Sequence, residues 1–316
     1  MPTGRASDGR LRAMSTPSAF ELYRREGRPF MRESAVLFLD VLGTGPMSSS
    51  LDELGDDDDE GRTAHVARLC DAWEEARELA GDDHGRSHAT SYFSDSVAVS
   101  LPYFVNGQHP EDVNTEFFWR AASLQTMLVH HGFLSRGGVS VGWHYADERI
   151  VYGPAQTRAV KLEEDTADMP RIALDPTFVA LERKHMKFFG DGLHAPQRFH
   201  LLVEGDLHYV NYLGVATRWI IDNEGDVQHW IRGHRDGLVR YWNDCVERAG
   251  DDPLPLRPRK KIEWSLRYHN WFCTQEPLGA DLVITPAAVA GADIEPLERE
   301  FVPYGENIKP IAERHI

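Results

Sequence analysis

A short run of β-prone residues, Ala35 to Leu39, constrains the fold most, because it ends in a carboxylate and is then interrupted. Asp40 follows the run directly, and Gly43 and Pro46 prevent the strand from continuing. An uninterrupted apolar run of this length is typical of a strand buried on both faces. We therefore expect a central strand with a carboxylate at its carboxyl end.

The pattern after this strand predicts an α+β domain. Apolar spacing of three and four predicts helices over residues 66–79 and 113–128, the second capped by Asp112 or Asn114, and Gly153-Pro154 opens a third helix that runs to residue 162. β-prone runs predict a hairpin of residues 89–93 and 97–102 turning at Ser94-Asp95-Ser96, and further strands at 137–142 and 171–174. This order predicts a ferredoxin-like antiparallel sheet with helices on one face.

The rest of the chain divides into a leader and an extension. Residues 1–32 are rich in Arg, Ser, Gly and Pro, and we expect a flexible leader. Residues 33–185 form the predicted α+β domain. Residues 186–316 form a C-terminal extension packed on the core, with a hairpin (199–203 and 207–213) and a long helix (225–249).

Composition excludes several classes of function. The chain has 34 basic and 50 acidic residues, a net charge of −16, which repels a nucleic-acid backbone. The basic cluster of Arg257, Arg259, Lys260 and Lys261 is therefore interpreted as a solvated interface segment. No apolar run approaches the roughly 20 residues of a membrane helix. Three scattered cysteines suit a reducing compartment, so we expect a cytoplasmic protein without nucleic-acid or membrane partners.

Asp40 and Asp95 are the candidate chemical pair. A ferredoxin-like sheet places the end of its first strand beside the turn of the neighbouring hairpin, so the two carboxylates would converge there. Mg²⁺ accepts one or two carboxylates and takes its other ligands from phosphates and water, as it would with a nucleoside triphosphate. Backbone amides at Gly43 and Thr44 would cradle phosphate.

These segments resemble motifs of class III nucleotidyl cyclases. The matching segments, in the family's order, are Phe38-Leu39-Asp40-Val41-Leu42-Gly43, Phe93-Ser94-Asp95-Ser96-Val97-Ala98-Val99, Gly137-Gly138-Val139-Ser140-Val141-Gly142 and Gly153-Pro154-Ala155. The resemblance covers residues 33–178 and implies two Mg²⁺ or Mn²⁺ ions held by Asp40, Asp95 and Val41. These ions would activate the ribose 3′-hydroxyl for attack on the α-phosphate.

Several positions depart from the family pattern. Ser91 and Ile150 stand where purine cyclases carry base-reading side chains, and this argues against a purine substrate. Thr157 and Lys161 stand where the family has its transition-state Asn and Arg. Lysine neutralises phosphate as a point charge, without the fork of arginine. The candidates to compensate are Arg158, one residue after Thr157, and Arg136, before the Gly-Gly strand.

One branch of the family is more similar, the pyrimidine cyclases of bacterial Pycsar anti-phage systems. Arg136-Gly137-Gly138, Pro170-Arg171-Ile172 and Tyr268-His269-Asn270-Trp271-Phe272 carry this resemblance, together with Tyr212-Leu213 and Trp264. It implies a homodimer with shared active sites that makes cyclic UMP, or else cyclic CMP, which activates a separate effector.

Tyr92 and Tyr152 are candidates to narrow the base pocket, although Tyr92 and its neighbour Phe93 must point to opposite faces of their strand. Two alternatives stay open: a catalytically silent cyclase-like sensor of a nucleotide or phage protein, and an adenylate cyclase.

Overall fold

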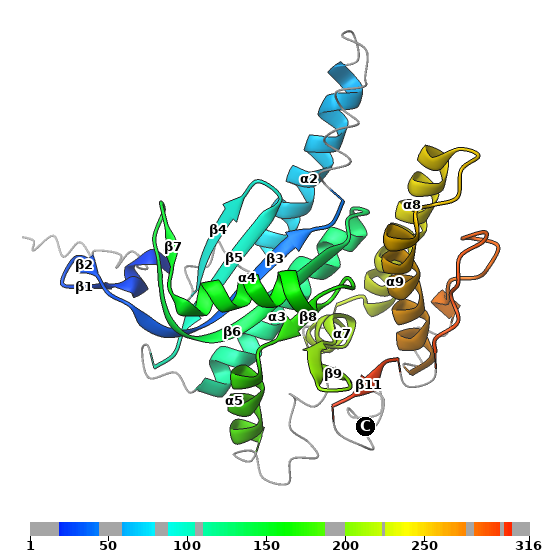
Figure 1. The fold of residues 1–316 in the computed structure, drawn as a ribbon. Helices are drawn as coiled ribbons and strands as arrows, with labels where there is room; N and C mark the ends of the chain where they lie inside the picture. Colours follow the sequence, from blue (N-terminus) through cyan, green and yellow to red (C-terminus); the bar gives the residue numbers. More distant parts are fainter. Residues whose placement is uncertain are drawn as a thin grey trace, which may run out of the picture.

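The computed structural model describes residues 19–43, 59–79, 88–104, 110–186, 200–222, 225–275, 281–297 and 300–304 (Figure 1). Its first part comprises a 3₁₀-helix η1 (Ala19–Tyr23), β1 (Arg24–Arg25), β2 (Arg28–Pro29), β3 (Arg32–Val41), α2 (Asp59–Leu79), β4 (Ala89–Phe93), β5 (Ser96–Pro102), α3 (Pro110–His130), β6 (Ser135–Ala146), β7 (Val151–Tyr152), α4 (Pro154–Thr166), β8 (Ile172–Leu174) and α5 (Pro176–Met186). Its second part comprises β9 (Leu201–Glu204), β10 (Leu207–Val210), α7 (Tyr212–Asp222), α8 (Val227–Ala249), α9 (Leu256–Gln275) and β11 (Val302–Pro303).

The described strands, apart from the β1-β2 hairpin, form one mixed sheet. Its order is β11-β9-β10-β8-β6-β3-β5-β4, with β7 paired to β6. The four strands β6-β3-β5-β4 are antiparallel neighbours and arise from a strand, helix, hairpin, helix, strand sequence. The predicted α+β, ferredoxin-like arrangement is therefore confirmed. β8 continues this sheet parallel to β6.

β3 is buried on both faces, as its continuous apolar run predicts. Ala35, Leu37, Leu39 and Val41 join the main core, which includes apolar residues of α2 and α3. The alternate residues Val36 and Phe38 pack on Ala155 and Ala159 of α4 instead. Figure 1 shows α4 crossing one face of the sheet while α3 lies behind it. Helices thus cover both faces, whereas the sequence predicted one.

Close packing of α4 on the sheet requires a glycine in β6. Gly138 is paired with Phe38, and a Cβ built on it would overlap the carbonyl oxygen of Ala159. The helix therefore approaches the strand more closely than any side chain would allow. This places the last turns of α4 over the end of β3 and the start of β6.

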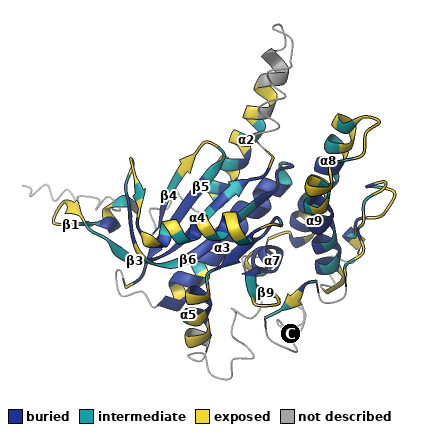
Figure 2. Ribbon diagram, in the orientation of Figure 1, coloured by how far each residue is buried: buried dark blue, intermediate teal, exposed yellow. Residues whose placement is uncertain are grey.

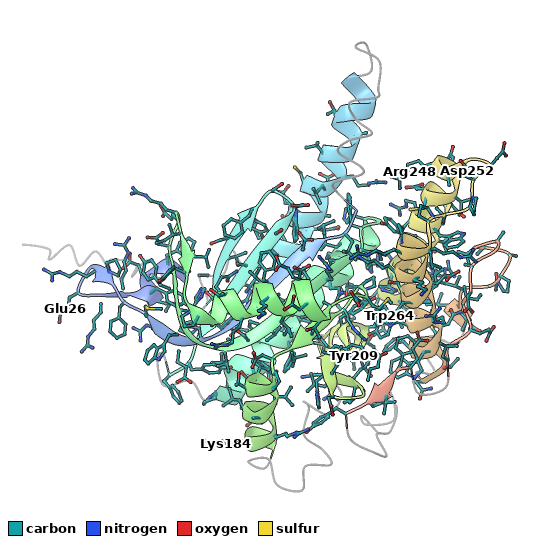
Figure 3. All side chains as sticks on the ribbon, viewed as in Figure 1. Glu26, Lys184, Tyr209, Arg248, Asp252 and Trp264 are labelled. Carbon is teal, nitrogen blue, oxygen red and sulfur yellow. The ribbon has the colours of Figure 1, made fainter. Side chains whose placement is uncertain are left out.

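The C-terminal part extends the sheet and packs against it. β10 pairs with β8, so the hairpin expected around Glu204-Gly205-Asp206 adds strands to the core. Tyr209 of β10 lies beside Trp264 of α9 with ring centroids 6.1 Å apart (Figure 3). α8 and α9 run side by side at the sheet's edge (Figure 1).

Three segments differ from the expectation. Residues 19–32, placed in the leader, form η1 and the β1-β2 hairpin, and Tyr23 is buried with Tyr145. α3 begins at Pro110, so neither Asp112 nor Asn114 is its N-cap. The strand expected to run to Leu213 ends at Val210, and a helix, α7, follows from Tyr212.

Candidate active site

Asp40 and Asp95 meet at the carboxyl end of β3. Asp40 is paired with Ser96 at the start of β5, so the β4-β5 turn that carries Asp95 lies beside it. The backbone N–H of Val41 donates to the carbonyl oxygen of Asp95 at 3.1 Å and ties the turn to the strand. Ser94 adopts a left-handed φ of 55°, which closes this turn. The fold therefore brings together two aspartates that are 55 residues apart in the sequence.

Burial and neighbouring groups both act on the Asp40 carboxylate. Burial raises the pKa of Asp40, the Ser96 hydroxyl opposes the rise by donating to Oδ1 at 2.8 Å, and the charge of Asp95 adds to it. Both side chains are half-buried, so water screens their charges only in part. Paired carboxylates that destabilise each other's charge are stabilised by a bound cation.

The donor set fits a hard divalent ion that brings other ligands with it. Within the described ranges, no group of three or more His, Cys, Asp or Glu side chains converges as a metal site. Two carboxylates alone leave most positions of an octahedral ion to water and phosphate oxygens. Mg²⁺ or Mn²⁺ in complex with a nucleotide therefore fits Asp40 and Asp95.

Arg136 and Glu163 form an ion pair next to Asp40. Arg136 is the β6 residue paired with Asp40, and its Nε contacts a carboxylate oxygen of Glu163 from α4. Burial raises the pKa of Glu163 to about 7, Arg136 opposes this rise, and Asp40 adds to it. Arg136, a candidate to replace the family's transition-state arginine, thus lies beside Asp40. Glu163 was not predicted, because an acidic residue at helical spacing looks like an ordinary surface residue.

α4 directs Thr157 and Lys161 to solvent. Both side chains are exposed, one turn apart on the same side of the helix. Figure 2 shows exposed positions along α4. Arg158, the suggested substitute, is held elsewhere: its Nη2 donates to the Val141 carbonyl oxygen at 2.5 Å, and its Nε lies 3.8 Å from Asp175. The Cβ-less Gly142 makes room for this guanidinium. Arg158 therefore braces α4 on β6 instead of joining the outward-facing pair.

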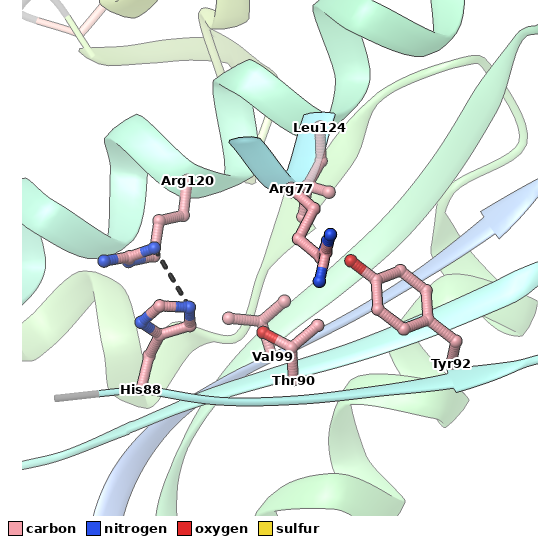
Figure 4. Close-up of a pocket in the computed structure, with 7 residues that line it drawn as sticks. All are labelled: Arg77, His88, Thr90, Tyr92, Val99, Arg120 and Leu124. Atoms are coloured by element: carbon pink, nitrogen blue, oxygen red, sulfur yellow. Dashed lines mark hydrogen bonds between the residues drawn. The ribbon is translucent and has the colours of Figure 1, made fainter. Parts of the chain in front are cut away.

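The hairpin separates the two candidates Ser91 and Tyr92. Ser91 is paired with Ala98, which is paired with Phe38, so Ser91 shares the sheet face of Asp40. Tyr92 points to the opposite face, where its ring packs edge-on against Trp73 of α2, with ring centroids 5.6 Å apart. There it lines a small pocket with Arg77, His88, Thr90, Val99, Arg120 and Leu124, and Figure 4 shows its hydroxyl directed toward Arg77. The structure does not bring Tyr92 to the aspartates, and strand alternation is the reason.

The remaining candidates lie in three different places. Val41 follows Asp40 with its side chain in the core, so only its backbone faces the site. Gly43 has a left-handed φ of 82°, and Thr44 lies outside the described residues. Tyr152 is 68% exposed and pairs with Tyr145, nine residues along β6 from Arg136, or about 30 Å of extended strand. Tyr152 therefore reaches an Asp40 only if that aspartate belongs to a second subunit.

The comparisons with known proteins give structural likenesses only. No protein-family model and no curated protein sequence matches the chain. The structure is similar to that of the adenylyl cyclase CyaB from P. aeruginosa, with 14% identity and a TM-score of 0.38 over 49% of this chain and 82% of that chain. It is also similar to the catalytic core of a rhodopsin-guanylyl cyclase with converted specificity in complex with ATPαS, with 15% identity and a TM-score of 0.35 over 57% of this chain and 95% of that chain.

Among the helices of the described residues, none has both the length and the apolar character that a membrane span requires.

Proposed function

We propose that the chain is a metal-dependent cyclase of a pyrimidine nucleoside triphosphate, with UTP favoured over CTP. One observation carries the proposal: the fold sets Asp40 and Asp95 side by side at the end of β3, close enough for the charge of one to raise the pKa of the other. The motif resemblance supports the same chemistry, because these are the two positions that match the family's metal aspartates.

The reaction joins the ribose 3′-oxygen to the α-phosphorus and breaks the bond from that phosphorus to the bridging oxygen of the β-phosphate. Pyrophosphate leaves with the electron pair, and the hydroxyl proton passes to solvent. Two bound Mg²⁺ or Mn²⁺ ions would supply Lewis-acid activation of the hydroxyl and charge neutralisation at phosphate. Asp40 and Asp95 would hold these ions, and the ion pair with Glu163 keeps Arg136 oriented beside Asp40.

The outward-facing Thr157 and Lys161 support a homodimer with shared sites. Both are exposed, and so cannot be assigned to packing within one chain. In the proposed dimer they face the Asp40 and Asp95 of the partner, where Lys161 neutralises phosphate charge. Tyr152 would reach the base from the same direction. Ser91, small and able both to donate and to accept, replaces the longer purine-reading side chain.

The biological setting follows from the resemblance to Pycsar cyclases. The cyclic pyrimidine nucleotide would be a second messenger made in the cytoplasm in response to phage, and a separate effector would bind it.

A product assay tests the activity. Purified protein is incubated with UTP, CTP, ATP or GTP and Mn²⁺, and the products are resolved by mass. We expect a cyclic pyrimidine monophosphate and pyrophosphate, with kcat reduced at least about 100-fold in Asp40→Ala and Asp95→Ala. Asp206→Ala, in the turn between β9 and β10, is the matched control and should keep full activity. Cyclic AMP as the sole product contradicts the pyrimidine specificity.

A catalytically silent, nucleotide-binding protein is the second candidate. The observation that favours it is the engagement of Arg158 with Val141 and Asp175, which leaves no arginine beside Thr157 on the exposed side of α4. Binding of UTP measured by calorimetry, with no pyrophosphate released under Mg²⁺ or Mn²⁺, would establish this function in place of the cyclase.

A further inference from the structure

An open cleft of about 320 Å³ lies where the end of β3 meets α8 and α9. Its apolar wall consists of Leu42, Leu134, Pro258 and Ile262, and Gly43 contributes exposed backbone. The polar side chains that line it are Tyr241, Arg257 and Lys261. Among the residues that the structure describes, none that lines the cleft is acidic, although the chain as a whole carries a net charge of −16. This composition suits a small anion.

The positive charges at the cleft are crowded. Burial lowers the pKa of Lys261, and the charges of Arg136 and Arg257 lower it further, against the opposing effect of Asp168 and Glu163. In the described part of the chain, neither Arg257 nor Lys261 forms an ion pair, whereas the neighbouring Arg259 is paired with Glu263 at 2.8 Å. Like charges held together without a paired carboxylate are stabilised when an anion binds between them.

The cleft lies near the aspartate pair. Gly43 comes three residues after Asp40, and the charge of Lys261 acts on both Asp40 and Glu163. A bound anion here would therefore lie next to the metal ligands. Gly43 also has little room for a side chain, because a Cβ built on it would lie 3.3 Å from the Tyr241 hydroxyl. The backbone at Gly43 thus lies against Tyr241 of α8 in the wall of the cleft.

We propose that Arg257 and Lys261 of α9 bind the β- and γ-phosphates of the substrate in cis, in the same subunit as Asp40 and Asp95. This inference rests on the proposed function and extends it to the C-terminal part of the chain. As the bond to the α-phosphorus breaks, negative charge accumulates on the leaving pyrophosphate. The two cations stabilise that charge, independently of Lys161 on the exposed side of α4.

Inorganic pyrophosphate is the probe that tests the cleft. Its affinity is measured by calorimetry, with and without Mn²⁺, for the unmodified protein, Arg257→Ala, Lys261→Gln and the double variant. Lys260→Ala is the matched control, because Lys260 is an exposed cation on the same turn that does not line the cleft. We expect the double variant to bind pyrophosphate at least about 10-fold more weakly and Lys260→Ala to bind it normally. Thermal melts check that each variant is folded, and Arg257, being exposed, tolerates substitution.

The outcomes separate this inference from the cyclase proposal. Cleft-dependent pyrophosphate binding, with no cyclic product from any nucleotide, supports the cleft and contradicts the cyclase. A cyclic product together with unchanged pyrophosphate affinity in the double variant overturns the cleft and leaves the cyclase intact. An equal loss in Lys260→Ala shows diffuse electrostatic attraction and also overturns it. In an active enzyme, the double variant should lower kcat/KM for the nucleotide at least about 10-fold.

Discussion

At the scale of single residues, the fold contains carboxylates whose protonation depends on their burial. Asp40 and Glu163 belong to the candidate site, but Glu182 of α5 lies elsewhere and is fully buried. It accepts a hydrogen bond from the side-chain amide of Asn114, whose oxygen accepts one from Tyr103 at 2.6 Å. Burial raises the pKa of Glu182 to about 8, the Asn114 bond opposes the rise, and the charge of Glu111 adds to it.

This shift predicts a pH-dependent stability. Unfolded Glu182 loses its proton near its ordinary value of 4.5, whereas the native state retains it until about pH 8. The native state binds more protons in between, so the free energy of unfolding falls as pH rises through this window. Glu182→Gln keeps a neutral acceptor for the Asn114 amide and removes this pH-dependent loss of stability. Urea unfolding measures the free energy of unfolding of both proteins at pH 5 and at pH 8. The difference, variant minus unmodified protein, should be larger at pH 8 than at pH 5 by about 2 kcal/mol or more.

The control for this measurement is Glu148→Gln, since Glu148 is exposed. A relative stability of Glu182→Gln that stays constant between pH 5 and pH 8 would show that Glu182 is ionised in the native protein.

At the scale of elements, sequence patterns identify the strands and helices whose burial is regular. The apolar run of β3, the hairpin turn at Asp95, the apolar spacings of α2 and α3 and the Gly153-Pro154 start of α4 all predicted elements that are present. α9 was missed because nearly every side is buried: Ile262, Trp264, Leu266 and Tyr268 alternate like a strand, while the intervening residues are also covered. α7 was missed because its first residues continue the β-prone pattern of β10.

Sequence patterns also did not predict which distant elements contact each other. Strand alternation predicted that Tyr92 and Phe93 face opposite ways, but not which one shares the face of Asp40. That choice depends on which residues of β5 face α4. Likewise, nothing in the sequence around Arg257 and Lys261 predicts that they lie close to Gly43, which precedes them by more than 200 residues.

Close packing of α4 on the sheet predicts a large effect of a single methyl group. Gly138→Ala would place a Cβ against the Ala159 carbonyl, so α4 must move away from β6. We expect a loss of about 1–3 kcal/mol in the free energy of unfolding. Gly205→Ala is the comparison, because it meets no atom within 4 Å and suffers only from its φ of 59°. Urea denaturation measures both; a Gly138→Ala protein as stable as the parent would contradict the close approach.

At the scale of the whole molecule, the candidate site is assembled from widely separated parts of one sheet and its edge. β3 and the β4-β5 turn supply the aspartates, β6 and α4 supply the Arg136–Glu163 pair, and α9 returns from the C-terminal part to place Lys261 nearby. The cationic cleft and the paired carboxylates thus have different origins in the sequence. Their proximity at the end of β3 provides a local balance of positive and negative charge in an otherwise acidic chain.

The central claim is that Asp40 and Asp95 hold divalent metal together, and Mn²⁺ binding tests it most directly. Electron paramagnetic resonance counts the Mn²⁺ ions bound in the presence of a non-hydrolysable UTP analogue, first for the unmodified protein and then for Asp40→Asn, Asp95→Asn and the control Asp206→Asn. We predict two ions per chain in the unmodified protein and the control, and loss of bound Mn²⁺ in both site variants. Equal binding in all four proteins would contradict the account.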